Sequence, residues 1–469
     1  MKEKIALLLK KNMSLSVEEI SKLLEAPPSP ELGDYSFPCF ALSKEMQKSP
    51  NLIAIQLSQR IELPEEVEKI EARGAYLNFF LNKKTLASSV IKKILSDKLN
   101  YGKENIGKGE EVLIEHTSIN PNASPHVGRI RNALIGDSIV RINKFFGFKP
   151  EVHYYVNDVS KQIAILVLAN AEKSSFSEML KKYSETAQKV EADKELEKKV
   201  FTLLYKFEHK DKETTKKFKA IVSTCVKGQA KILSKLGIEY DYFDYESKYV
   251  RNSENILKLL EKTGKLKKDE DNRHYIDQSG TDIEVKTKAP VFVLTRNDGT
   301  GLYPLRDISY EIEKLEKAKR NIIVLGEDQK LYAEQLALAM KILGYDFPKV
   351  VHYSFMLISD KGESKKMSTR RGDVVLLEDF LAEVVKKAKE EIAKRKTKGD
   401  AEKVGLSAVK YSILSHNSNK NILFNLSQAL SFEGNTGPYL LYTYARASSI
   451  LRKAKGKNPG LVIEKVTPQ

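Results

Sequence analysis

Apolar and polar positions repeat with a helical period at the start of the chain. Apolar residues recur every three or four positions over 2–11 and 16–25, which predicts two amphipathic helices. Ser16 is placed to cap the second helix, with Glu19 three positions later completing a capping box. A proline-rich loop and a short aromatic strand follow. Residues 1–105 are therefore expected to form a small α/β domain.

After a polar linker the pattern changes to strand, loop, helix and strand. The short apolar runs 112–116 and 152–156 predict buried strands, and the stretch 127–145 between them keeps one face apolar. Ser124 followed by Pro125 predicts the start of this helix, because it offers a capping hydroxyl and then a proline in the first turn. A strand–helix–strand unit of this length predicts an α/β fold of the Rossmann type, with a doubly wound parallel sheet.

Alternating elements continue downstream. Strands are expected at 291–296, 322–325 and 350–358, and helices at 308–319, 330–343, 386–400 (basic and exposed) and 404–455. Residues 106–403 are therefore expected to form the main domain, with a lysine- and glutamate-rich helical insertion over about 170–285. Residues 404–469 are expected to belong to a further helical domain.

The composition shows an excess of positive charge and excludes several classes of protein. The 469 residues carry 79 Lys+Arg against 63 Asp+Glu, a formal net charge of +16, which favours a polyanionic partner such as nucleic acid. A lysine-rich proteome is the alternative explanation. The two cysteines, Cys39 and Cys225, match no disulfide or zinc spacing. Since no apolar run approaches the length of a membrane span, we expect a cytoplasmic protein with no membrane partner.

The segment 120–129 carries the first candidate chemistry. It follows a predicted strand and opens a helix, whose N-terminus attracts phosphate through unpaired N–H groups and a partial positive charge. His126 can donate to phosphate oxygens, Gly128 lets a base or ribose approach the backbone, and Arg129 adds a cation. A capped helix with an incidental histidine is the alternative.

The segment 365–372 carries the second candidate chemistry. Its cations, including Lys365, Lys366 and Arg370, lie on a glycine-flanked loop and suit a clamp on a developing pyrophosphate. Taken alone, it is equally described as a basic surface loop.

Together these two segments resemble the HIGH and KMSKS signatures of class I aminoacyl-tRNA synthetases. Further blocks make the chain similar to arginyl-tRNA synthetases of the archaeal type: 33–35, 115–121, 131–137, 154–158, 298–307, 367–372 and 435–446. This resemblance covers nearly the whole chain. It implies two-step chemistry, in which arginine attacks the α-phosphate of ATP and the arginyl group then passes to the 3′ end of tRNA(Arg).

The resemblance also implies roles for particular residues. Arginine-binding roles fall on Glu115, Ser118, Asn120, Gln162, Tyr303, Asp307 and Gln329. Catalytic and ATP-binding roles fall on Pro125, His126, Gly128, Arg129, Lys365, Lys366, Met367, Ser368 and Arg370. Asp307 is the natural partner for a guanidinium, and Tyr303 lies four positions earlier, so one helical turn would present both. Mg²⁺ is expected to arrive with ATP, and no metal site of the protein's own is expected.

Three departures from the family pattern stand out. Arg129 replaces the final histidine of HIGH, the second lysine of KMSKS is missing with Arg370 one position late, and Ser160 stands where the family has glycine. Arginine and lysine differ in geometry, so Arg370 is not an equivalent substitute.

The resemblance further implies that residues 1–105 contact the tRNA elbow. It implies that 404–469 contact the stem and begin an anticodon-binding domain that stops early. We therefore expect a monomer that charges tRNA poorly, or one served by a second chain with the missing helices. Two alternatives remain: another HIGH-type nucleotidyl transferase or class I synthetase, and a tRNA-binding fragment or half of a split enzyme.

Overall fold

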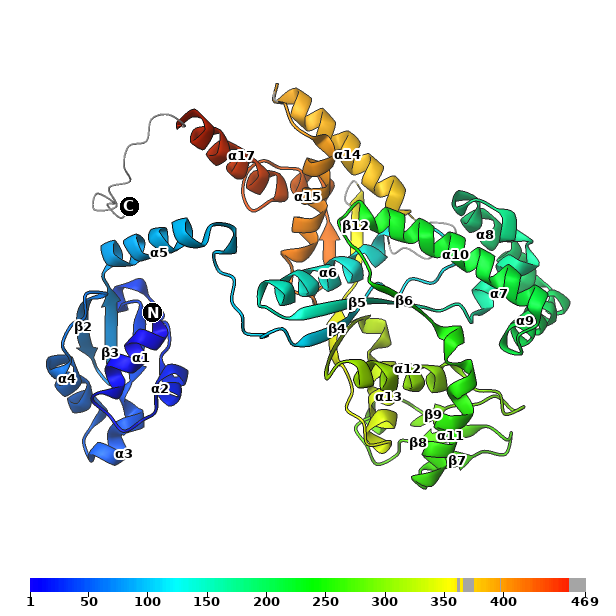
Figure 1. The fold of residues 1–469 in the computed structure, drawn as a ribbon, viewed down its shortest axis with the longest axis horizontal. Coiled ribbons are helices and arrows are strands. Elements are labelled where there is room, and N and C mark those ends of the chain that lie inside the picture. Colours follow the sequence, from blue (N-terminus) through cyan, green and yellow to red (C-terminus); the bar gives the residue numbers. More distant parts are fainter. Residues whose placement is uncertain (361–362, 366–374, 397, 455–469) are drawn as a thin grey trace. The chain divides into compact units, whose positions relative to one another are not determined.

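The computed structural model describes residues 1–360, 363–365, 375–396 and 398–454 (Figure 1), with side chains for 1–357, 375–396 and 398–454. The chain forms two compact units, Met1–Gly102 and Lys103–Leu451.

The first unit is a small α/β domain around an antiparallel sheet. Its elements are α1 (Lys2–Lys10), α2 (Val17–Leu23), β1 (Tyr35–Pro38), α3 (Ser43–Met46), α4 (Pro50–Arg60), β2 (Val67–Arg73), β3 (Tyr76–Leu81) and α5 (Lys83–Asp97). The strands are ordered β1-β3-β2, and apolar side chains of α1, α2 and α4 pack into one core with them. The predicted capping box is confirmed: Ser16 Oγ accepts from the Glu19 N–H at 3.2 Å, and Glu19 accepts from the Ser16 N–H at 2.8 Å.

The second unit is built on a five-stranded parallel sheet. Its strands are β4 (Glu111–Glu115), β5 (Lys149–Val156), β6 (Tyr242–Tyr245), β10 (Arg320–Gly326) and β11 (Lys349–Tyr353), in the order β11-β10-β4-β5-β6. The chain starts in the middle at β4, moves outward through β5 and β6, and returns to β10 on the other side of β4. The expected doubly wound fold is confirmed, and its topological switch point lies between β4 and β10.

Helices cover both faces of this sheet. Figure 1 shows α6 (Ile130–Phe145) on one side, and α12 (Tyr303–Lys317) and α13 (Lys330–Ile342) on the other. Between β5 and β6 the chain forms α7 (Lys161–Leu168), α8 (Phe176–Ala192), α9 (Lys194–Glu208) and α10 (Lys212–Ser234). Apolar side chains of these four helices pack together, which agrees with the amphipathic pattern of that stretch.

The remaining elements of this unit lie downstream of β6. They are α11 (Ser253–Lys262), β7 (Leu266–Lys268), β8 (His274–Asp277), β9 (Val291–Val293), β12 (Met356–Asp360), β13 (Glu363–Lys365), α14 (Leu377–Lys394), α15 (Ala401–Leu414), β14 (Ile422–Phe424), α16 (Leu426–Ala429) and α17 (Gly437–Ala454). They include two small sheets, β7-β8-β9 and β13-β12-β14.

Buried Arg131 of α6 ties two distant segments together. Its guanidinium donates to the backbone carbonyls of Ser354 (2.6 Å), Lys420 (2.8 Å) and Asn417 (2.9 Å). These contacts fix the entries to β12 and β14 against α6.

Several expectations differ from the structure. The single strand expected at 350–358 is two strands in different sheets, β11 and β12. The helix expected at 386–400 is α14, which begins at Leu377 and ends at Lys394, and the range expected as helix over 404–455 contains β14 between α15 and α16. The helix expected to begin at Ser124–Pro125 begins later, with a 3₁₀ turn at Val127–Arg129 before α6. The helix expected at 308–319 begins earlier, at Tyr303, with a proline in its first turn. The range expected as a helical insertion contains β6, an edge strand of the parallel sheet. The strand expected near 291–296 lies in the separate sheet β7-β8-β9.

Candidate active site

The switch point brings the ends of β4 and β10 together with the start of α6. Ligands of doubly wound sheets bind at this edge, outside the carboxyl ends of the strands. Asn132 of α6 bridges the two strand ends: its Nδ2 donates to the Val324 carbonyl at 2.8 Å, and its Oδ1 accepts from the Thr117 N–H at 2.5 Å. The loop after β4 is therefore anchored to β10 through one buried amide.

The backbone of this loop is strained. Thr117 has φ +89° and Ser118 has φ +40°, and a β-branched residue rarely adopts such a conformation. Besides Asn132, the hydroxyl of Tyr240 holds the turn, at 2.6 Å from Thr117 Oγ1. The predicted arginine ligand Ser118 thus lies half-buried in a conformation imposed by its surroundings.

The segment 125–127 pairs with a strand-like stretch from far along the chain. The Val127 N–H donates to the Val375 carbonyl at 3.0 Å, and the Leu377 N–H donates to the Pro125 carbonyl at 2.8 Å. His126 is therefore extended, and Ser124 caps nothing: its buried hydroxyl has no hydrogen-bond partner among the described residues. This pairing explains why the helix begins after the predicted position.

His126 lies half-buried at the start of the 3₁₀ turn. Burial, reinforced by the neighbouring cation Arg129, lowers its pKa to about 4, so the imidazole is neutral at pH 7 and can donate one hydrogen bond. Its buried Nδ1 has no partner within the described part of the chain. A Cβ on Gly128 would lie 3.1 Å from the His126 ring, so the glycine leaves room for that imidazole as well as for a ligand.

Asp307 lies in the first turns of α12, half-buried, and contacts residues from two other elements. Tyr155 near the end of β5 donates its hydroxyl to Asp307 Oδ1 at 3.1 Å, and Tyr332 of α13 donates to Oδ2. Tyr303, one turn before Asp307, packs its half-exposed ring against Tyr332 at 5.2 Å between centroids. One helical turn thus presents Tyr303 and Asp307 to the same tyrosine.

Glu115, at the end of β4, belongs to a buried charge cluster. Lys314 of α12 donates to Glu115 at 2.5 Å and to Glu311 at 2.8 Å, and all three side chains are at most 4% exposed. Burial alone would lower the pKa of Lys314, but the two carboxylates raise it above its usual value, so the ammonium stays charged. Burial raises the pKa of Glu311.

The remaining predicted arginine ligands lie around this edge without contacting Asp307 in the described structure. Gln162 is in the first turn of α7, and its buried Oε1 has no hydrogen-bond partner among the described side chains. Gln329 ends the 3₁₀ turn after β10 and precedes α13. Asn120 lies in the loop after β4, where its carbonyl accepts from Gln229 at 2.9 Å.

Most of the second signature falls outside the described residues. Lys366, Met367, Ser368 and Arg370 lie there entirely, and Lys365 is described only as the last residue of β13. The departure at Ser160 has a local explanation: its hydroxyl is the N-cap of α7.

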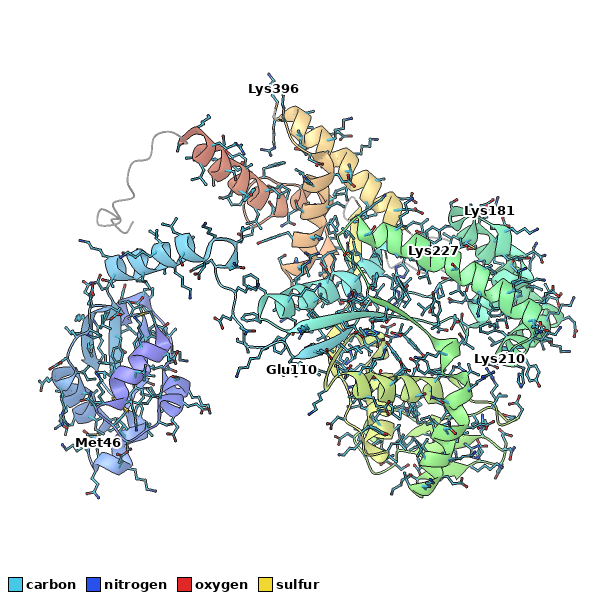
Figure 2. The ribbon with its side chains drawn as sticks, viewed as in Figure 1. Met46, Glu110, Lys181, Lys210, Lys227 and Lys396 are labelled. Carbon is cyan, nitrogen blue, oxygen red and sulfur yellow. The ribbon has the colours of Figure 1, made fainter. Side chains whose placement is uncertain are left out.

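A basic groove of about 880 Å³ lies between α9, α10 and the end of β6. Lys210, labelled in Figure 2, lines it together with Lys212, Lys216, Lys219 and Lys248, and the carboxylates of Asp158 and Glu208 also line it. Lys248 is paired with Glu313 at 2.7 Å, whereas the other four lysines form no ion pair with a described residue. Partial desolvation and the neighbouring cations Arg251 and Lys219 lower the pKa of Lys210. Such a set of unpaired ammonium groups suits a polyanion.

The described residues contain neither a metal-binding cluster nor a helix that could span a membrane. No group of three or more His, Cys, Asp or Glu side chains is arranged to hold a metal ion there. None of the helices in that part of the chain is long and apolar enough to cross a membrane.

Several residues that shape the site had no role in the interpretation of the sequence. Tyr155 and Tyr332 contact Asp307. Lys314 pairs with both Glu115 and Glu311. None of Tyr155, Tyr332, Lys314 and Glu311 was expected at the site. One signal was available for Lys314: it lies seven positions after Asp307, two turns along the same helical face.

Comparison with known proteins defines the class. A family model described as tRNA synthetases class I (R), catalytic domain, matches residues 90–426, and one described as arginyl tRNA synthetase N terminal domain matches residues 1–81. The arginine–tRNA ligases of Methanocaldococcus jannaschii and Clostridioides difficile are 37% and 34% identical over 457 residues, each covering 94% of this chain and 79% of the relative. The structure of Thermus thermophilus arginyl-tRNA synthetase aligns with a TM-score of 0.78 at 26% identity, covering 100% of this chain and 83% of that one.

The doubly wound sheet, the His126 turn at its switch point and the catalytic-domain match together define a class I aminoacyl-tRNA synthetase. Within that class, the chain belongs to the arginyl-tRNA synthetase family. The reaction of this family joins arginine to tRNA, with ATP as a substrate.

Proposed function

We propose that Asp307 and the residues around it bind the side chain of arginine and that the His126 turn binds ATP. The observation that carries this proposal is the state of Asp307. It is a half-buried carboxylate whose hydrogen bonds come from neutral phenols, so its negative charge is not cancelled by a paired cation. A guanidinium is the side chain that such a group binds best, through two parallel N–H···O bonds.

The rest of the arginine site follows from placement. Tyr303 and Gln329 flank the substrate side chain, and Gln162 offers an amide oxygen with no partner in the described structure. Glu115 lies with Ser118 and Asn120 beside the first strand and serves the amino-acid backbone. Because Lys314 already pairs with Glu115, we propose that the substrate ammonium shares this carboxylate with Lys314.

On the ATP side, Pro125, His126 and Gly128 form the wall nearest the phosphates, and Arg129 adds positive charge. A neutral His126 donates a hydrogen bond and leaves charge neutralisation to the cations. Lys365, Lys366, Met367, Ser368 and Arg370 are proposed to contact the pyrophosphate. Mg²⁺ is proposed to arrive with ATP, held by the oxygens of its phosphates.

For tRNA, we propose three contact regions. The four unpaired lysines of the basic groove, Lys210, Lys212, Lys216 and Lys219, would hold the phosphates of the 3′ strand, and exposed Tyr245 at the groove offers a ring for base stacking. The first unit, where the N-terminal family model matches, would contact the tRNA elbow, and residues 404–469 the stem. We further propose that the protein is a cytoplasmic monomer.

The test is amino-acid-dependent ATP–pyrophosphate exchange, with and without tRNA. We expect exchange with arginine, and D307N should raise the KM for arginine more than tenfold while the KM for ATP changes little. D346N is the matched control, because Asp346 is exposed in the turn after α13. Robust exchange with another amino acid and none with arginine would refute the specificity. Equal losses for both substrates in D307N would assign Asp307 a structural role.

A further inference from the structure

We propose that Tyr155 and Tyr332 are positioning residues for arginine recognition, holding the Asp307 carboxylate ionised and in a fixed plane for the substrate guanidinium. This inference rests on the proposed arginine site. It adds two residues to that site, and it assigns specificity to the way Asp307 is held as well as to its charge.

The two phenols divide the carboxylate between them. Tyr155 donates to Oδ1 at 3.1 Å, and Tyr332 donates to Oδ2. They come from different elements, β5 and α13, while Asp307 lies on α12. With one donor fixed on each oxygen, the carboxylate cannot rotate about its Cβ–Cγ bond without breaking a hydrogen bond. Each oxygen accepts one phenol and keeps a second acceptor site.

Packing holds the donors themselves in place. Tyr155 stacks on Tyr310 with ring centroids 4.5 Å apart and planes inclined by 15°. Tyr310 in turn donates its hydroxyl to Asp244 at 3.1 Å. The ring of Tyr332 lies between two other aromatic rings, at 5.2 Å from Tyr303 and 5.7 Å from Phe292. Neighbouring rings thus hold the two hydroxyls in position before the substrate binds.

The nature of the donors matters for charge. Burial raises the pKa of Asp307 above its usual value, and the hydrogen bonds from Tyr332 and Tyr155, with the nearby charge of Arg306, oppose that rise. A salt bridge from a cation of the protein would also favour the ionised form of Asp307, but it would neutralise the negative charge that attracts the substrate guanidinium. The adjacent cation, Arg306, is committed elsewhere: its Nε donates to Glu246 at 2.6 Å, and it lies 3.6 Å from Glu208. Neutral phenols therefore favour the ionised form of Asp307 without pairing its charge with a cation.

Glu115 shows the contrast within the same site. Its carboxylate is paired with the ammonium of Lys314 at 2.5 Å, so its charge is largely neutralised before any substrate binds. The half-buried Asp307, in contrast, has no cation within salt-bridge distance among the described residues. A planar guanidinium can bind both of its oxygens, whereas the ammonium of lysine is a point charge that gains less from a fixed carboxylate plane.

The experiment uses the full chain with Y155F, Y332F and the double variant, and with Y345F as the matched control. Phenylalanine keeps each ring and removes only the hydroxyl, and Tyr345 is a partly exposed residue in the turn after α13. Pyrophosphate exchange in the presence of tRNA gives KM values for arginine and ATP between pH 6 and pH 8.5. Inhibition by citrulline, the neutral ureido analogue of arginine, is measured alongside.

We expect each single variant to raise the KM for arginine about tenfold or more, because a hydrogen bond to a charged group is lost. The KM for ATP should stay within about twofold, the usual range for a site whose contacts are unchanged. Without the phenols the pKa of Asp307 rises further. Arginine binding by the variants should therefore weaken as pH falls, and this weakening should begin at a higher pH than in the wild type. Citrulline should inhibit relatively better in the double variant, since a protonated Asp307 no longer favours the cation.

Three outcomes would overturn the inference. They are an unchanged arginine KM in both single variants, equal rises for arginine and ATP, and a lowered melting temperature with unchanged arginine KM and pH profile. The last would make the phenols purely structural. If one variant is insoluble, the other still tests the inference, because the two hydroxyls act on different oxygens. D307N distinguishes failure of the proposed arginine site from failure of the positioning role. If D307N leaves the KM for arginine unchanged, the proposed arginine site itself is wrong. If D307N raises that KM and the tyrosine variants do not, only the positioning role fails.

Discussion

Removing the cation of the buried cluster, with K314M, should destabilise the second unit in a strongly pH-dependent way. Lys314 is the only partner cation that the described structure gives to Glu115 and Glu311, at 2.5 and 2.8 Å. All three side chains are at most 4% exposed, so water cannot replace the lost ammonium. Methionine has a similar length and keeps the packing, which isolates the loss of charge.

The magnitude follows from burial. Removing one partner of a buried ion pair costs about 3–5 kcal/mol, because the other charge remains uncompensated. The pKa of Glu311 is already raised by burial, so the stability that this group contributes is highest at acidic pH and falls as pH rises. Without Lys314 the pKa of Glu311 rises further, because the charge of Lys314 lowers it in the native protein. Protonation then limits the loss near pH 6, and the full cost appears near pH 8.5.

The assay is urea unfolding followed by circular dichroism at both pH values, since the chain has no tryptophan for fluorescence. K317M is the matched control: Lys317 lies on the same helix but is 41% exposed, and its ion pair with Glu313 spans 3.5 Å. We expect the control to lose less than about 1 kcal/mol. A loss in K314M below about 1 kcal/mol at pH 8.5, or an equal loss at both pH values, would contradict this account of the cluster.

Two further substitutions test packing and capping. In G136A the new Cβ would lie 2.2 Å from Cγ of buried His116. We therefore expect overpacking to lower the free energy of unfolding by about 1–3 kcal/mol, seen as a lower melting temperature. An unchanged melting temperature would show that His116 can move aside. S16A removes one half of the capping box with Glu19, and amide hydrogen exchange in α2 should speed up by the equivalent of about 1 kcal/mol, whereas unaltered exchange would mean that tertiary packing alone holds that helix.

Local patterns in the sequence predicted the elements that depend on neighbours in the chain. The capping box at Ser16 formed as expected because both of its hydrogen bonds lie within four residues. The pair Tyr303 and Asp307 shares one helical turn because α12 has its regular period there, although the helix begins earlier than expected, with Pro304 in its first turn. The doubly wound sheet also followed from short-range alternation of strands and helices.

The start of α6 shows where local reasoning ends. Ser124 and Pro125 are a good capping pair by themselves, but the backbone of 125–127 is paired with Val375 and Leu377. A stretch some 250 residues away supplies hydrogen bonds that a helix cap would otherwise supply. No window of sequence around Ser124 contains that information.

The sequence by itself determined the family, the fold class and Asp307 as the candidate guanidinium ligand, because residue types and their spacing carry those. The tertiary structure alone decided how the charges of the site are held. Asp307 is bonded by the neutral phenols Tyr155 and Tyr332, while Glu115 is neutralised by Lys314. Both carboxylates are acidic residues at the same sheet edge, and only the partners brought in from β5, α12 and α13 distinguish a free charge from a paired one. The energy of a charge depends on its three-dimensional surroundings, and those are set by packing between elements far apart in the chain.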